Sequence, residues 1–170
     1  MDTPAQKLDF AVRAAFPPLI TLGFILLPGI PVPWPFFSDG VAPLAFASVC
    51  FWVVAMPELF GRRWSFFFGL MQDMLSGGVF GVSAAAYLFA DLALRSQAPH
   101  FLQRSFGVFW IFYAALAIAV GLLQWGAASL LQHHAALLAP AALRTVLGVC
   151  IFPGVAFILG QIQRAFLSRV

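Results

Sequence analysis

The sequence predicts an all-α polytopic membrane protein with six transmembrane helices, and composition is the first observation behind this expectation. Of the 170 residues, 62% are hydrophobic and 9% are charged, and the mean hydropathy is +0.96. A water-soluble domain of this length would need many more charged residues on its surface. The apolar runs are also much longer than the alternating segments of about ten residues in an outer-membrane barrel, so they favour helices.

The order of the apolar segments and the placement of charge are the second and third observations. We expect a single transmembrane domain over residues 1–170, with helices at 14–29, 43–56, 64–76, 79–94, 106–131 and 141–166. With both termini in the cytoplasm, eight of the nine basic residues fall on the cytoplasmic side, and Arg144 is the exception. This bias is the positive-inside rule, and it favours six spans. The basic residues form no continuous tract, so nucleic acid is not an expected partner.

The first segment follows Lys7 and Arg13, and no small-residue cleavage site comes after it, so we expect an uncleaved span rather than a signal peptide. A Pro-rich link leads to the second segment, which ends just before Pro57. The fifth and sixth segments are the longest. Pro153 is expected to kink the sixth, because proline removes a backbone donor inside a helix.

The third and fourth segments are short for membrane spans. The chain from Trp64 to Arg95 allows about 24 Å for each arm of a tight hairpin at a rise of about 1.5 Å per residue. The hydrocarbon core is about 30 Å thick. The hairpin is therefore expected to end below the outer surface, to thin the bilayer, or to be covered by other helices.

The turn of this hairpin carries the motif GLMQDMLSGGVFGVSAAAY, which begins at Gly69. Gly69, Asp73, Gly77 and Gly81 recur at every fourth position, so a continuous helix would carry them on one face. Gly78 completes the Ser-Gly-Gly turn. Small residues at this spacing allow two helix backbones to approach closely, either inside the subunit or against a partner.

Asp73 lies roughly 13 Å beyond Trp64 by helical rise, and an acid at that depth is costly unless it is paired, protonated or hydrated. Three roles remain open. Gln72 and Asp73 can hydrogen-bond the backbone at the turn or at the start of the next helix near Ser83, whose dipole favours an anion. Alternatively, Asp73 faces a partner, or it handles a proton or solute. The last role is disfavoured, because no other acid or histidine lies at a comparable depth.

The other chemically interesting residues give weaker signals. Asp91 and Arg95 have the spacing of a helical ion pair, and a simple pair at the membrane interface is expected. His133 and His134 are adjacent, which is not the spacing that places two metal ligands on one helix face. Cys50 and Cys150 lie within apolar segments and are expected to pack. No catalytic motif is present, so neither an enzyme nor a cofactor is expected.

Three stretches occur in a characteristic order along the chain, FWVVAMPELF, FFFGLMQDMLSGGVFGVSAAAY and IFPGVAFILGQIQRAF. In this order of elements the chain resembles the MreD family of rod-shape-determining membrane proteins. The family's hairpin motif is matched by Gly69, Asp73, Gly77 and Gly81, with supporting matches at Gln72, Pro57 and Pro153.

The resemblance implies a multi-pass protein of the bacterial inner membrane that belongs to the elongation machinery. It implies binding to the single-span protein MreC and, through MreC, a link to the MreB filament and to RodA with its transpeptidase. The implied role is a scaffold for lateral peptidoglycan synthesis and cell shape, without catalysis or a cofactor.

The family is also similar in fold to the substrate-binding subunits of energy-coupling-factor transporters, which keeps a vitamin-binding alternative open. That alternative predicts a polar outer pocket. The outer loops offer little to form one beyond Asp39, His133, His134 and Arg144.

Overall fold

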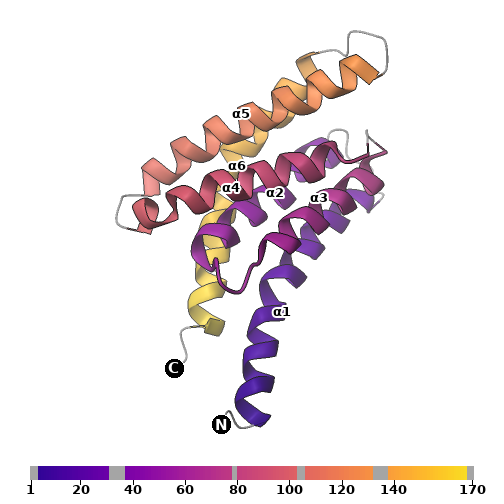
Figure 1. Ribbon diagram of the computed structural model, residues 1–170. Helices are drawn as coiled ribbons and strands as arrows, with labels where there is room; N and C mark the ends of the chain where they lie inside the picture. The colour runs from indigo at the N-terminus through magenta and orange to yellow at the C-terminus, as the bar shows by residue number, and fades with distance from the viewer. Residues whose placement is uncertain (1–3, 31–36, 78–79, 103–105, 132–137, 168–170) are drawn as a thin grey trace.

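The protein is described by a computed structural model that covers residues 4–30, 37–77, 80–102, 106–131 and 138–167 (Figure 1). The helices are α1 (Pro4–Leu26), a short 3-10 helix η1 (Leu27–Gly29), α2 (Phe37–Ala55), α3 (Arg62–Ser76), α4 (Val82–Leu102), α5 (Phe106–Leu131) and α6 (Leu138–Leu167). No strand occurs within these ranges. The expected all-α fold with six helices is therefore confirmed.

Several helices extend beyond the expected ranges. The first begins at Pro4 instead of residue 14, and the second begins at Phe37 instead of residue 43. The fourth begins at Val82 and continues to Leu102, where the sequence predicted 79–94. The expected limits were placed where the apolar residues stop. A helix can continue beyond that point, because many polar residues also have a high helix propensity. Hydropathy thus located the six helices better than it located their ends.

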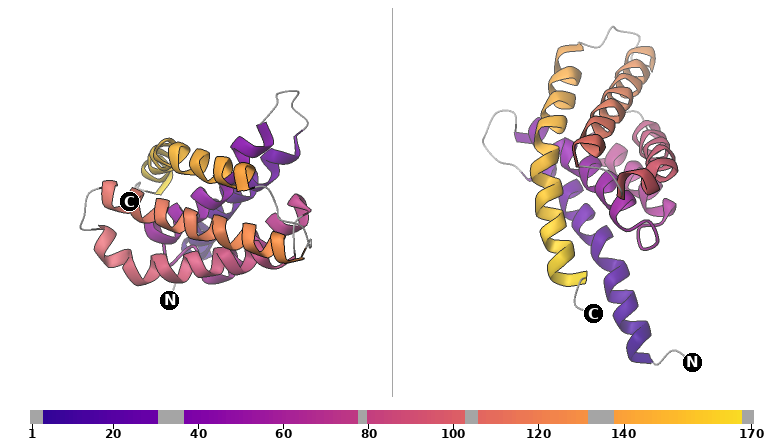
Figure 2. Two further views of the ribbon diagram at one scale, coloured as in Figure 1. Left: turned by 90° about the horizontal axis from the view of Figure 1, so that it is seen from above. Right: turned by 90° about the vertical axis from the view of Figure 1, so that its left-hand side faces the viewer.

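The helices form a bundle in which successive helices run in alternate directions. The first turn of α1 and the last turn of α6 lie at the same end of the bundle, and α1 projects beyond its neighbours there (Figures 1 and 2). The α2 helix is central and contacts α1, α4 and α6, while α3 packs mainly on α4. The hairpin of α3 and α4 is thereby held against the central helix.

The core forms around α2, which is buried almost throughout. Residues 45–50 and 52–54 are all buried, although the polar residue Ser48 lies among them. The Ser48 hydroxyl lies 2.9 Å from that of Thr21 on α1, and Thr21 in turn donates to the carbonyl of Pro17. On the opposite side of α2, the rings of Tyr113 and Phe152 stack with centroids 3.8 Å apart and join α5 to α6.

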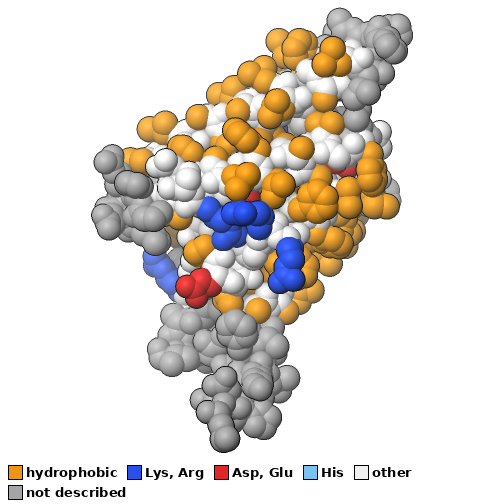
Figure 3. Space-filling view, viewed as in Figure 1, with side chains coloured by type: hydrophobic (Ala, Val, Ile, Leu, Met, Phe, Trp, Pro, Cys, Tyr) orange, Lys and Arg blue, Asp and Glu red, His pale blue; other side chains and the backbone are white. Residues whose placement is uncertain are grey.

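Much of the apolar surface is left unburied. Two helices, Phe106–Leu130 and Leu138–Ala165, are long and apolar enough to cross a membrane, yet only 22% and 28% of their most apolar windows are buried within the protein. The core helix of a soluble protein would be mostly buried. Figure 3 shows apolar side chains covering most of one face of the molecule. Such extensive apolar exposure is consistent with a membrane protein.

The other helices give less direct evidence of membrane crossing. Shorter apolar segments occur at Ala14–Gly29 and Pro43–Ala55. The third helix has 15 residues, which gives about 22 Å at about 1.5 Å per residue. It is therefore too short to cross a hydrocarbon core of about 30 Å unaided.

Pro153 lies inside α6 without ending it. The ribbon of α6 changes direction part-way along the helix (Figures 1 and 2). Since Pro153 is near the middle of the helix and proline removes an internal backbone hydrogen bond, it is a sufficient cause for a bend there.

Candidate functional site

The hairpin turn depends on two glycines with left-handed backbone conformations. The third helix ends at Ser76, and Gly77 follows with φ +63°, while Gly81 has φ +92°. Residues with a Cβ rarely adopt these angles. Because the helix ends before Gly77 and Gly81, only Gly69 and Asp73 of the four recurring residues share a face of α3. Gly78 lies outside the described residues.

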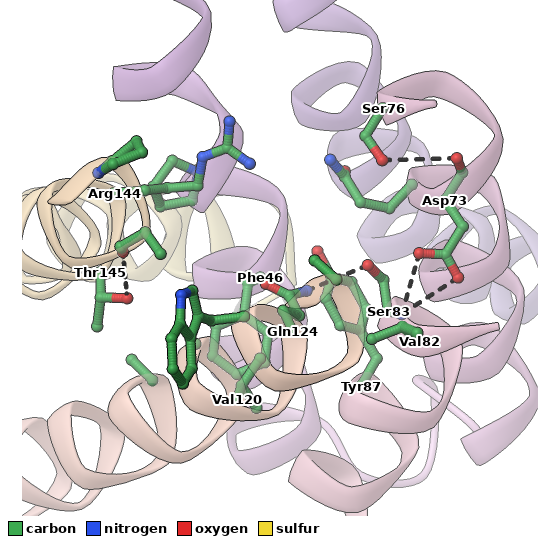
Figure 4. Close-up of a pocket in the computed structure, with 18 of the residues that line it drawn as sticks. Phe46, Asp73, Ser76, Val82, Ser83, Tyr87, Val120, Gln124, Arg144 and Thr145 are labelled. Carbon is green, nitrogen blue, oxygen red and sulfur yellow. Dashed lines mark hydrogen bonds between the residues drawn. The ribbon is translucent and has the colours of Figure 1, made fainter. Parts of the chain in front are cut away.

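Asp73 is buried, and its carboxylate caps the start of α4. Its Oδ2 atom accepts hydrogen bonds from the backbone N–H of Gly81 at 2.8 Å and of Ala84 at 3.3 Å. The N–H of Ser83 lies 3.0 Å from Oδ1 and 3.1 Å from Oδ2. Figure 4 shows the carboxylate directed at Ser83. The first N–H groups of a helix have no acceptor within the helix, and the helix dipole favours an anion there.

This geometry corresponds to the first of the three roles that the sequence left open for Asp73. Both carboxylate oxygens are engaged by backbone donors of α4. Gln72 was expected to share this capping role, but its Oε1 atom is buried without a hydrogen-bond partner among the described residues. The described N–H donors at the start of α4 are bonded to Asp73.

Gly69 allows the backbones of α3 and α4 to touch. A Cβ placed on Gly69 would lie 2.5 Å from the Cα of Ala84 and 2.7 Å from the carbonyl oxygen of Ser83. Gly69 and Asp73 are four residues apart on α3, so the close approach and the cap lie on the same helix face. By contrast, a Cβ at Gly77 or Gly81 meets no described atom within 4 Å.

Asp91 lies at the other end of the hairpin and is completely buried. It accepts a hydrogen bond from the Ser65 hydroxyl at 2.9 Å and from Nε of Arg95 at 2.9 Å, and Nε of Arg62 is 3.5 Å away. The expected ion pair between Asp91 and Arg95 is present, and α4 also turns Asp91 inward against α3.

Arg95 extends this cluster into the link between α2 and α3. Its Nη1 atom donates to the carbonyl of Pro57 at 2.8 Å, and its Nη2 atom donates to the carbonyl of Phe60. The hairpin therefore carries a buried carboxylate at each end. Asp73 on α3 holds the first turn of α4, and Asp91 on α4 holds the first turns of α3.

A pocket of about 360 Å³ lies beside the Asp73 cap (Figure 4). Five helices line it, with Pro43 and Phe46 from α2, Gln72, Asp73 and Ser76 from α3, Val82, Ser83 and Tyr87 from α4, Tyr113, Ala117, Val120, Gly121, Gln124, Trp125 and Ala128 from α5, and Pro140, Ala141, Arg144 and Thr145 from α6. The side-chain amide of Gln124 donates to the Ser83 hydroxyl at 3.1 Å and so joins α5 to the cap.

Sequence reasoning named Gln72, Asp73, Ser83 and Arg144 but missed the other polar residues of this lining. It looked to the outer loops for polar groups, whereas Gln124, Tyr113 and Thr145 come from the helices themselves. A glutamine inside the long apolar α5 segment was the available signal. Asp39, His133 and His134 cannot be compared, because the side chain of Asp39 and both histidines lie outside the described part of the chain.

A second hollow, the apolar groove, lies between α2, α5 and α6 and has a volume of about 580 Å³. It is lined by Phe51, Val54, Ala55, Phe106, Phe109, Pro153, Ala156, Phe157, Gly160, Gln161, Gln163 and Arg164. Small residues of α6 thus lie between bulky aromatic ones.

The described residues include no group of three or more metal-ligating side chains close enough to share an ion. Cys50 is buried, Cys150 is exposed, and both are free thiols.

Comparison with known proteins gives one informative finding. A family model described as rod shape-determining protein MreD matches residues 12–166. No curated protein and no solved structure matches. The matched residues include the whole hairpin, the linings of the pocket and of the apolar groove, and both buried aspartates.

Proposed function

Since the chain belongs to the MreD family of rod shape-determining proteins, we propose that it is a non-catalytic membrane scaffold of the bacterial elongation complex. The resemblance recognised in the sequence is confirmed, and the family has a role in rod shape determination. In the proposed role the protein binds MreC and supports lateral peptidoglycan synthesis. MreC connects it to the MreB filament and to RodA with its transpeptidase.

The observation that carries this proposal is how the hairpin uses its polar groups. Both oxygens of Asp73 accept backbone N–H donors of α4, and Asp91 is occupied by Ser65 and Arg95. A catalytic acid or a proton carrier needs an oxygen that reaches a substrate or a proton path. These carboxylates instead fix one helix against another, as a scaffold requires.

The proposed topology has six spans in the inner membrane, with both termini in the cytoplasm. The alternate directions of the helices support it, as does the common end at which α1 begins and α6 finishes (Figure 1). Arg62 and Arg63 are exposed at the start of α3. Figure 3 shows basic side chains gathered toward that same end of the molecule, which agrees with a cytoplasmic location.

The apolar groove is the surface we assign to the single transmembrane helix of MreC. Association between helices in lipid depends on close packing at small residues, because both helices are already in an apolar solvent. Ala156 and Gly160 supply small residues, and Phe51, Phe109 and Phe157 supply rims against which a helix can pack.

Substitution Gly160→Leu tests this assignment. A Cβ at Gly160 meets no described atom within 4 Å, so the backbone leaves room for a side chain that projects into the groove. We expect affinity purification from native membranes to recover MreC and wall-synthesis subunits with the parent protein but not with this variant. Gly126→Leu is the matched control, because Gly126 is equally open and lines neither hollow.

Recovery of MreC by both variants alike would remove the groove from the proposal. Recovery of ATPase and coupling subunits in place of MreC would contradict the scaffold and identify the substrate-binding subunit of a vitamin-type transporter, to which the polar-lined pocket would then belong.

A further inference from the structure

We propose that Trp110 on α5 replaces the backbone donor that Pro153 removes from α6, and that this hydrogen bond fixes the half of α6 that lines the apolar groove. Trp110 is then a positioning residue for the surface assigned to the partner helix. The use of that surface by MreC rests on the proposed function, whereas the hydrogen bond and its effect on α6 do not.

The carbonyl of Val149 is the group that Pro153 leaves without its helical donor. In an α-helix each carbonyl accepts a hydrogen bond from the N–H four residues further along the chain. For Val149 that residue is Pro153, which lies inside α6 and has no N–H. A carbonyl without a donor is costly in lipid, and a neighbouring helix can supply what the proline removes.

The indole of Trp110 supplies this donor. Its Nε1 atom donates to the carbonyl oxygen of Val149 at 3.0 Å, which is a normal hydrogen-bond length. A tryptophan of the interfacial belt keeps its polar edge toward water and headgroups. Trp110 instead directs its N–H to a neighbouring helix, and to the carbonyl that the proline frees.

Aromatic side chains of α5 also contact the residue before the proline. The buried ring of Phe152 stacks on Tyr113 and on Phe106, with centroids 3.8 Å and 6.3 Å apart, and meets Phe109 edge-on at 5.3 Å. Stacking holds Phe152 against α5. The hydrogen bond to Val149 adds a directional contact about one turn earlier in α6, so α5 holds both sides of the bend.

The bend divides α6 between the two hollows. The α6 residues of the polar-lined pocket end at Thr145, whereas those of the apolar groove begin at Pro153 and continue to Arg164. The direction of the second half therefore sets how far Ala156 and Gly160 lie from the groove walls on α2 and α5. A surface that is already fixed costs less to occupy than one that must first be ordered. Holding the bend thus prepares the groove for a partner helix.

The first test is thermal unfolding of the purified full-length protein in detergent, with Trp110→Phe made in the parent and in a Pro153→Ala background. Alanine at position 153 restores the N–H for the Val149 carbonyl, so the indole donor is no longer needed. We expect Trp110→Phe to lower Tm by about 2–4 °C in the parent. In the Pro153→Ala background the decrease should be about half of that or less.

Trp64→Phe is the matched control for loss of an indole ring. Trp64 is 39% exposed and Trp110 is 38% exposed. The ring of Trp64 contacts Phe67 and Phe68 within α3, so its substitution removes ring contacts that do not involve α6. The decrease in Tm that it causes should be the same with proline or alanine at position 153.

The second test measures the position of the groove-lining half of α6 and does not require Pro153→Ala to fold. Spin labels at Leu92→Cys on α4 and Ile158→Cys on α6, both exposed, are placed in a background without the native cysteines. We expect one narrow distance distribution in the parent and a broader one in Trp110→Phe, because the bend is no longer held. A loss of stability alone, as in Trp64→Phe, should leave the distribution unchanged.

An equal decrease in Tm for Trp110→Phe in both backgrounds would overturn the proposal, as would an unchanged distance distribution in that variant. Because neither measurement includes MreC, their failure is separate from failure of the scaffold, which Gly160→Leu tests.

Discussion

Two buried aspartates hold the hairpin from opposite ends, and they differ in what compensates their charge. Asp73 is surrounded by backbone N–H groups at the start of a helix. Asp91 is paired with the guanidinium of Arg95 and the hydroxyl of Ser65. Each therefore has a definite set of donors, and removal of either carboxylate would leave different groups unsatisfied.

Substitution of Asp73 by alanine should reduce stability. Three backbone N–H groups would lose their acceptor, and we expect a loss of about 2–4 kcal/mol in the free energy of unfolding. Asp73→Asn retains one acceptor oxygen and should lose less. Thermal or denaturant unfolding in detergent measures both, with the exposed Glu58→Ala as the control. Unchanged unfolding of Asp73→Ala would mean that the cap contributes nothing to stability.

Substitution of Arg95 by methionine should be more damaging than loss of the whole pair. The variant leaves Asp91 buried without its nearest cation, which costs about 3–5 kcal/mol. The double variant Arg95→Met with Asp91→Asn removes the unpaired charge and should recover part of that loss. A double-mutant cycle, with the free energy of unfolding measured for the parent, both single variants and the double variant, gives the interaction free energy of the pair. If the losses of the two single variants simply add in the double variant, the two residues do not interact.

At this scale the sequence predicted which residues matter better than it predicted their contacts. The depth of Asp73 could be calculated from helical rise, and that alone marked it for attention. The burial of Asp91 could not, because it depends on which side of α4 faces α3. The same limit applies to Gln72, because its place in the sequence does not show which of its polar atoms find hydrogen-bond partners.

At the scale of elements, the contact between α3 and α4 depends on the missing side chain of Gly69. The backbones of α3 and α4 touch at that point. The Asp73 cap and the turn glycines come after Gly69 in the same hairpin. The sequence predicted this hairpin from its short arms, yet its recurring glycines turned out to have two separate functions, close contact at Gly69 and positive φ at Gly77 and Gly81.

Gly69→Ala should therefore separate the two arms. The added methyl group would overlap the backbone of Ala84, which cannot rotate away as a side chain does, and we expect a loss of about 1–3 kcal/mol. Gly126→Ala is the matched control, because Gly126 is also helical and its Cβ would be unobstructed. That control should be neutral or stabilising by up to about 1 kcal/mol. Equal behaviour of the two variants in thermal unfolding would refute close packing at Gly69.

At the scale of the whole molecule, the sequence predicted the number of helices and the class of protein because both follow from hydropathy. It could not predict the pocket, since a pocket depends on how five helices diverge at their ends. The polar groups that line it are separated by long stretches of sequence, from Gln72 on α3 to Thr145 on α6.

The proposed topology can be checked by labelling single cysteines. In a background without Cys50 and Cys150, Arg63→Cys at the start of α3 and Ala139→Cys at the start of α6 place exposed thiols at opposite ends of the bundle. We expect a membrane-impermeant maleimide, given access to the outer face only, to label Ala139→Cys. Arg63→Cys should react only after permeabilisation. The reverse pattern would invert the topology, and equal labelling would contradict a membrane crossing between them.

The cap that Asp73 provides to α4 also constrains how the protein is made. The first N–H groups of α4 find their acceptor on α3, and α3 is too short to cross the bilayer alone. During synthesis, neither arm is therefore suited to leave the insertion machinery before the other has emerged. The two arms should enter the lipid together, so nascent chains arrested after α3 should stay accessible to protease, and chains extended through α4 should become protected.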